Sequence, residues 1–81
     1  MELKVGDLAV YTSTKGHGKI LFKVISVPVP NVFIGGVPIK ILVKGDNEIT
    51  NRGLEHNIKT KRGMGFNASK VTKYVLTLEN K

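Results

Sequence analysis

Short runs in which apolar and polar residues alternate, separated by Gly and Pro, make up most of this chain. Alternation with a period of two is typical of half-buried β-strands. Nowhere do apolar residues recur with the helical period over about ten residues or more. The segments that predict strands are 8–12, 20–27 and 37–44, followed by a closing strand over 74–78.

The segment 37–44 carries the clearest strand pattern. We expect its apolar odd-numbered positions to face the core: Val37, Ile39, Ile41 and Val43. The opposite face carries two lysines, Lys40 and Lys44, together with Pro38 and Leu42. This arrangement predicts a half-buried strand with a basic outer face.

The other strands are less regular. Residues 20–27 are apolar on both faces, so we expect a β-bulge within them. Residues 31–34 predict a short piece of strand that turns at Gly35-Gly36, a dipeptide suited to a hairpin. In residues 8–12, Tyr11 lies on the face opposite Leu8 and Val10, and we expect its ring to be exposed.

The fold class follows from the number and length of these segments. Residues 48–67 are polar and interrupted by Gly, and they predict one or two short strands, whereas Ala68–Lys70 predicts a single helical turn. So few residues cannot form a two-sheet sandwich, and a small bent barrel hides its sheet edges. We therefore expect one all-β domain over residues 1–81, a five- or six-stranded barrel with one short helical turn near the C-terminus.

The order of these elements resembles the SH3-like barrels of KOW, CarD-type and Tudor-like modules. The resemblance covers about half of the chain and rests on Lys4-Val5-Gly6-Asp7-Leu8-Ala9-Val10-Tyr11, on Gly18-Lys19, on Phe22-Lys23-Val24-Ile25-Ser26-Val27 and on Phe66 to Tyr74. It implies an SH3-like barrel of a class that binds RNA, DNA, ribosomal proteins, RNA polymerase or peptides. Such a range of ligands leaves the partner of this chain open.

The charge of the chain favours a polyanionic partner. Thirteen Lys and Arg residues against six Asp and Glu give a net charge of +7 and a pI near 9.9. Nucleic acid is the commonest polyanion that such a small basic domain meets. Most of the basic residues are Lys, which suits phosphate contact better than the reading of bases. We therefore expect a non-enzymatic module that binds DNA or RNA phosphates largely independently of sequence.

The candidate nucleic-acid residues fall into three groups. The Gly-rich loop after the first strand supplies Lys15, His17 and Lys19, and the outer face of segment 37–44 supplies Lys40 and Lys44. The densest basic run supplies Lys59, Lys61 and Arg62, and we expect Lys59 and Lys61 to share one strand face. The aromatic candidates for base stacking are Tyr11 and Phe66, although a core position is the favoured interpretation for Phe66.

Residues 29–38 support a second interpretation. They are apolar and uncharged, with prolines at positions 30 and 38. An exposed apolar patch of this kind docks proteins, and its candidate interface residues are Val32, Phe33 and Ile34. The alternative function is a protein-binding module or small inhibitor, such as a phage-type accessory protein, that grips an acidic partner. A loop that only covers the core explains the same residues equally well.

Other function classes find little support in the sequence. The chain lacks Cys, and its two histidines, His17 and His56, lie far apart, so we expect no metal and no cofactor. No motif joins a nucleophile to a base, which argues against an enzyme. The start of the chain lacks an apolar signal region and no window suits a membrane span, so we expect a cytoplasmic monomer or weak homodimer with no membrane partner.

Overall fold

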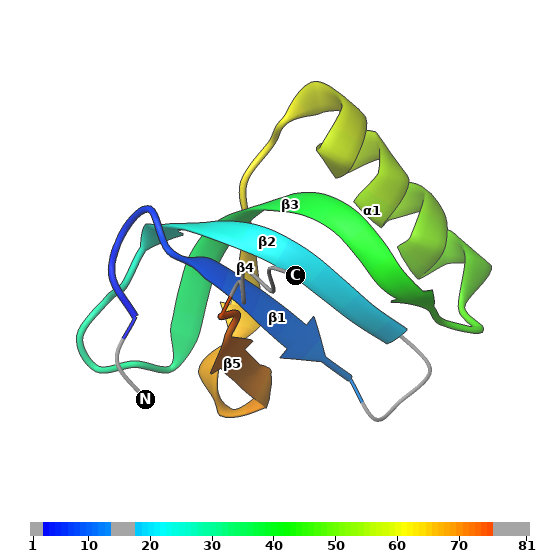
Figure 1. Cartoon of the computed structure of the whole chain (residues 1–81). Helices are drawn as coiled ribbons and strands as arrows, with labels where there is room; N and C mark the ends of the chain where they lie inside the picture. The colour runs from blue at the N-terminus through cyan, green and yellow to red at the C-terminus, as the bar shows by residue number, and fades with distance from the viewer. Residues whose placement is uncertain (1–2, 14–17, 76–81) are drawn as a thin grey trace, which may run out of the picture.

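The computed structural model describes residues 3–13 and 18–75, which form one curled antiparallel sheet with a helix beside it (Figure 1). The sheet contains five strands in the order β4-β3-β2-β1-β5. Their bounds are β1 Leu8–Thr12, β2 Gly18–Ser26, β3 Phe33–Lys44, β4 Met64–Asn67 and β5 Val71–Lys73. The helix α1 spans Glu48–Thr60, and the short 3-10 helix η1 spans Ala68–Lys70. The expected all-β fold class is confirmed in that the chain is mostly β, with five antiparallel strands in a half-barrel, one helix and a 3-10 turn.

The core fills the inside of the curl. Its buried apolar side chains are Ala9, Ile20, Phe22, Val24, Ile34, Leu54, Phe66 and Val71. The rings of Phe22 and Phe66 stack with their centroids 4.1 Å apart. Gly36 lies against the Phe22 ring so closely that an added Cβ atom would overlap it. Aromatic stacking therefore depends on a glycine in the neighbouring strand.

Three β-bulges bend the sheet into this shape. The ladder between β2 and β3 skips Ile25 on β2, and it skips Ile39 and Leu42 on β3. A bulged residue is unpaired and increases the local bend and twist of its strand. The bulge expected within residues 20–27 is confirmed. All three bulged residues are large, apolar and exposed, at 48% for Ile25, 44% for Ile39 and 41% for Leu42.

The strands expected within residues 48–67 are largely replaced by α1, and only β4 matches that expectation. Asn47 caps the start of the helix, where its side-chain oxygen accepts the backbone N–H of Thr50 at 3.0 Å. Leu54 packs into the core and Ile58, one turn later, is half-buried. The buried position one turn before Leu54 is taken by polar Asn51. The apolar face is therefore too sparse for its helical period to be recognised in the sequence.

Segment 31–44 also differs from the expectation. Gly35-Gly36 makes no hairpin, because β3 runs without interruption from Phe33 to Lys44. Its buried positions are Ile34, Gly36 and Pro38, which reverses the expected phase, although Lys40 and Lys44 are exposed as expected. The bulges at positions 39 and 42 shift the phase along the strand. Of the four residues expected to face inward, only Ile41 packs against the core.

The C-terminal part confirms one expectation and corrects another. The helical turn at Ala68–Lys70 is present as η1 and connects β4 to β5, the two edge strands of the sheet. The final strand is Val71–Lys73 rather than residues 74–78, of which 76–78 lie outside the described residues. Tyr74 follows β5, and its backbone N–H donates to the carbonyl of Leu8 at 2.9 Å. Neither helix in the described part of the chain is long and apolar enough to cross a membrane.

Candidate nucleic-acid interface

Three lysines share the outer, convex face of the sheet. Cross-strand pairing defines this face, because directly paired residues of antiparallel strands point to the same side. One row pairs Lys19 with Val43 and Thr12, the next pairs Leu21 with Lys40 and Val10, and the third pairs Lys23 with Val37 and Leu8. We call Lys19, Lys23 and Lys40 the outer-face lysines. All three are exposed.

The outer-face lysines have no carboxylate partner among the residues that the structure describes. Within residues 3–13 and 18–75, no carboxylate contacts any of their ammonium groups. Elsewhere among the described residues, the ammonium group of Lys44 lies 4.0 Å from Glu55 and that of Lys73 lies 3.8 Å from Asp7. The outer face therefore carries uncompensated positive charge.

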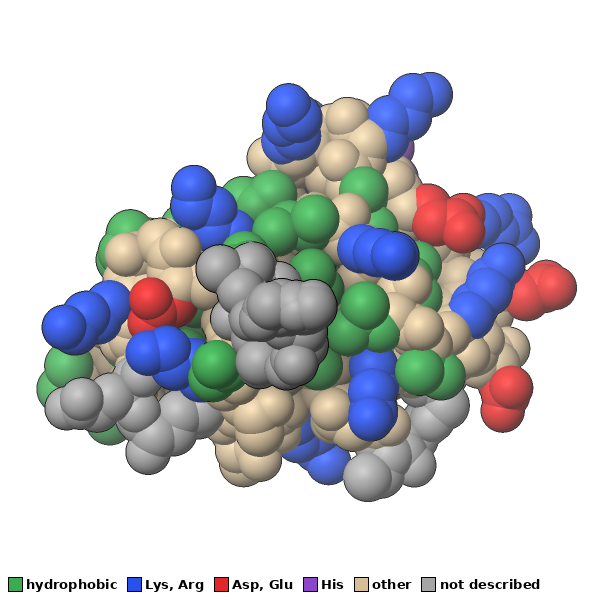
Figure 2. Space-filling view, in the orientation of Figure 1, with side chains coloured by type: hydrophobic (Ala, Val, Ile, Leu, Met, Phe, Trp, Pro, Cys, Tyr) green, Lys and Arg blue, Asp and Glu red, His purple; other side chains and the backbone are tan. Residues whose placement is uncertain are grey.

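The acidic side chains are concentrated elsewhere. Asp46, Glu48 and Glu55 belong to the corner where β3 leads into α1, and Asp7 accepts the backbone N–H of Lys4 at 2.9 Å. These are all the acidic residues in the described part of the chain. Figure 2 shows acidic side chains at the left and right of the molecule, each beside Lys or Arg, and further Lys and Arg side chains on the face between them. This separation gives the molecule an electropositive face.

A second basic group lies at the end of α1. Lys59 is in the last helical turn, and Lys61 and Arg62 follow it, all three exposed. Lys61 ends the helix in a left-handed conformation, with φ 58°. Its backbone N–H bonds to the carbonyl of Asn57. The expected strand with Lys59 and Lys61 on one face is therefore wrong. Positive charges at this position also interact favourably with the negative, C-terminal end of the helix dipole.

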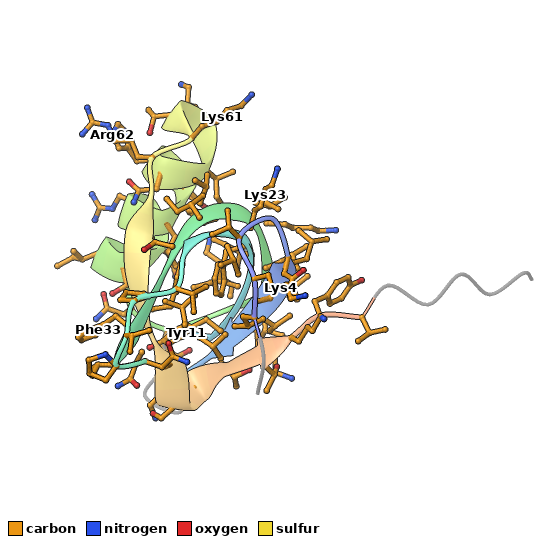
Figure 3. The ribbon with its side chains drawn as sticks, turned by 90° about the vertical axis from the view of Figure 1, so that its left-hand side faces the viewer. Lys4, Tyr11, Lys23, Phe33, Lys61 and Arg62 are labelled. Carbon is orange, nitrogen blue, oxygen red and sulfur yellow. The ribbon has the colours of Figure 1, made fainter. Side chains whose placement is uncertain are left out.

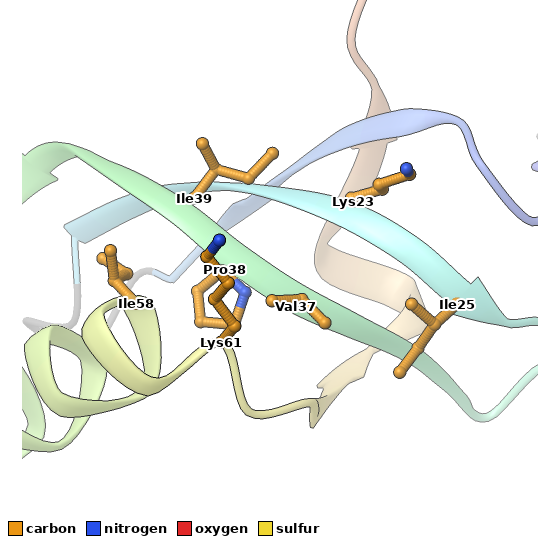
Figure 4. Close-up of a pocket in the computed structure, with 7 residues that line it drawn as sticks. All are labelled: Lys23, Ile25, Val37, Pro38, Ile39, Ile58 and Lys61. Atoms are coloured by element: carbon orange, nitrogen blue, oxygen red, sulfur yellow. The ribbon is translucent and has the colours of Figure 1, made fainter.

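A partly enclosed groove lies between the outer face and the helix end (Figure 4). Its volume is about 480 Å³, and it is lined by Lys23, Ile25, Val37, Pro38, Ile39, Ile58 and Lys61. Lys23 could not be recognised as a candidate from the sequence, because residues 20–27 are apolar on both faces and their inward phase is ambiguous. The groove brings Lys23 and Lys61 to one site although they are far apart in the sequence.

The remaining candidates for nucleic-acid contact have different outcomes. Lys44 is exposed but lies against Glu55, and Lys15 and His17 are outside the described residues. The expected exposure of Tyr11 is wrong, since its half-buried ring packs against the core, 5.4 Å from that of Phe66. Phe66 is a core residue, as favoured. Neither aromatic ring is therefore free to stack on a base.

The apolar segment is divided between surface and core. Val32 and Phe33 are 54% and 55% exposed, whereas Ile34 is buried in the core. Phe33 lies on the opposite side of the molecule from Lys4 in Figure 3. Val32 and Phe33 are not among the residues that line the groove, so they form a separate exposed apolar patch.

The chain matches no protein-family model, no curated protein and no solved structure. The half-barrel itself is compatible with a small-barrel fold.

Proposed function

We propose that the chain is a non-enzymatic, cytoplasmic module that binds the phosphate backbone of nucleic acids through the outer face of its sheet. The observation that supports this proposal most directly is the set of outer-face lysines, which have no carboxylate partner within the described residues. Phosphate contacts by lysine supply most of the affinity in sequence-independent binding. The resemblance to SH3-like barrels that bind RNA or DNA agrees with this function.

The side chains present favour the backbone over the bases. Lysine offers a point charge, whereas the bidentate reading of guanine uses the planar fork of arginine. Stacking on single-stranded bases needs exposed aromatic rings beside the cations. The rings of Tyr11 and Phe66 pack in or against the core, and the exposed Phe33 is in none of the three rows that hold the outer-face lysines. We therefore expect similar affinities for unrelated duplex sequences, with little preference for single strands.

The separation of the acidic corner from the basic outer face would orient the protein as it approaches a nucleic acid. The acidic corner between β3 and α1 turns away from a polyanion, while the outer face and the helix end attract it. Lys61 and Arg62 extend the positive surface beyond the sheet. A duplex would then lie across the outer-face lysines toward the end of α1.

The test compares two variants of equal net charge by fluorescence anisotropy with a labelled duplex at low salt. The first variant replaces the outer-face lysines: Lys19→Gln, Lys23→Gln and Lys40→Gln. The matched control removes three cations at or near carboxylates: Lys44→Gln, Arg52→Gln and Lys73→Gln. We expect the first variant to lose affinity by roughly ten- to a hundredfold and the control by about threefold at most. Equal losses would show that only net charge matters and would contradict this surface.

A further inference from the structure

The groove beside α1 exposes apolar side chains that the fold does not require at the surface. Two of its residues, Ile25 and Ile39, are bulged out of the β2–β3 ladder and are exposed. Bulges are frequent next to functional sites, where they redirect a side chain. A polar residue at either bulge would bend the sheet equally well. The apolar character of both positions therefore points to a ligand that covers them.

The groove has one lysine on each of its two sides. Lys23 and Ile25 come from β2, Ile58 and Lys61 from the end of α1, and β3 forms the floor between them with Val37, Pro38 and Ile39 (Figure 4). None of the described residues that line the groove is acidic. The ligand that complements this arrangement is apolar in the middle and negatively charged on both sides.

Three kinds of occupant fit less well. A nucleobase needs a stacking ring, whereas the floor of the groove is aliphatic. A fatty acid has one carboxylate at one end, which cannot reach a lysine on each side. A second copy of the chain would bring together two molecules of net charge +7. A protein segment with carboxylates flanking an apolar residue meets every requirement.

We infer that this groove binds an acidic segment of a partner protein, with one large apolar side chain against Ile25 and Ile39 and flanking carboxylates on Lys23 and Lys61. The site is distinct from the nucleic-acid function proposed above in its apolar contacts, although Lys23 and Lys61 belong to both surfaces. It is also distinct from the exposed Val32 and Phe33, which lie outside the groove.

The test titrates isotope-labelled protein with peptides in which one Leu or Phe stands between Asp and Glu residues, and follows the backbone amides by NMR. We expect saturable shifts centred on Ile25, Ile39 and Lys61, with the amide of Phe33 unmoved. Replacing the peptide carboxylates with amides should weaken binding by about tenfold, because the two lysines then lose their partners. Binding that is unchanged by this replacement would overturn the inference.

A matched pair of variants tests the apolar contact. The Ile39→Ser variant should bind the peptide about tenfold more weakly, because the apolar side chain that the peptide would cover is lost. Leu42→Ser is the control, because Leu42 is also a bulged, exposed residue of β3 but does not line the groove. Both variants should keep the wild-type dispersion of amide signals. Equal loss in the two variants would contradict the groove as the site.

Other occupants give distinguishable results. Saturable binding of laurate but not of the peptides would make the groove a site for anionic lipids. If the wild-type protein sediments as a dimer and the Ile39→Ser variant as a monomer, the occupant of the groove would be a second copy of the chain. Either result, or the absence of saturable shifts with any acidic peptide, would overturn the inference. The affinity of Ile39→Ser for duplex DNA should stay within about twofold of the wild type, because the phosphate contacts remain. The two proposals can therefore fail separately.

Discussion

At the scale of single residues, Lys61 combines an unfavourable backbone conformation with a position in the groove. Its φ of 58° lies in the left-handed region, where a residue with a Cβ atom is strained by about 1 kcal/mol or more. Glycine adopts this conformation freely and is the usual residue at a helix C-terminus. The lysine is therefore less stable at this position than glycine would be, while its ammonium group serves the surface.

We predict that Lys61→Gly raises the free energy of unfolding by about 1 kcal/mol. The matched control is Lys59→Gly, inside the last helical turn, which should lower it by about 1 kcal/mol. Both changes remove one positive charge, so their difference isolates the backbone. Urea denaturation measures both values. Destabilisation by both variants would show that the lysine side chain stabilises this helix end.

The second prediction at this scale concerns Gly36, which lies against the Phe22 ring. A methyl group there would overlap the Phe22 ring, so we expect Gly36→Ala to cost about 3 kcal/mol of stability. Gly65→Ala is the control, because the Cβ atom added at Gly65 comes no closer than 4.0 Å to its nearest neighbour, Phe33. Thermal unfolding followed by circular dichroism compares the two. A Gly36→Ala variant as stable as the control would mean that the core adjusts without loss.

At the scale of elements, α1 packs against the core of the half-barrel through few side chains. Leu54 is its buried apolar residue, and the side-chain amide of Asn51 donates to the carbonyl of Gly45 at 2.9 Å. Gly53 faces open space in the middle of the helix. The helix therefore depends on tertiary contacts and its caps more than on intrinsic helix propensity.

We predict opposite effects from two changes in this helix. Gly53→Ala should stabilise the protein by about 1 kcal/mol, because alanine restricts the unfolded chain and meets no obstacle here. Asn47→Ala should destabilise it by about 1 kcal/mol through loss of the cap to Thr50. Denaturant midpoints measure both. If neither substitution moves the midpoint, α1 does not unfold together with the sheet.

The same element shows how far the sequence could predict this fold. Strand 8–12 and the turn at 68–70 were predictable because local alternation and turn residues determine them. The helix was not, because its inner face places polar Asn51 beside Leu54 and its middle contains Gly53. The bulges at Ile39 and Leu42 were equally hidden, since a strand shifts its phase only when paired with a partner.

At the scale of the whole molecule, the candidate nucleic-acid surface depends on the pairing of β1, β2 and β3. The sequence indicated Lys40 as an outward-facing strand residue and Lys19 as a loop residue. The position of Lys19 in β2, and of Lys19 and Lys23 on the same face as Lys40, follows from the register between β1, β2 and β3. The proximity of Lys61 requires α1, which replaces an expected strand. The net charge was evident from composition, whereas its separation from the acidic corner needed the fold.

The most direct measurement for the proposed function is the salt dependence of duplex DNA binding by the wild-type protein. For phosphate contacts by the outer-face lysines and Lys61, the affinity should fall on the order of a hundredfold between about 50 and about 200 mM salt. In the variant that lacks the outer-face lysines, the dependence should be much shallower. No binding at the lower salt concentration, or binding that does not change with salt, would contradict a phosphate-binding surface on this sheet.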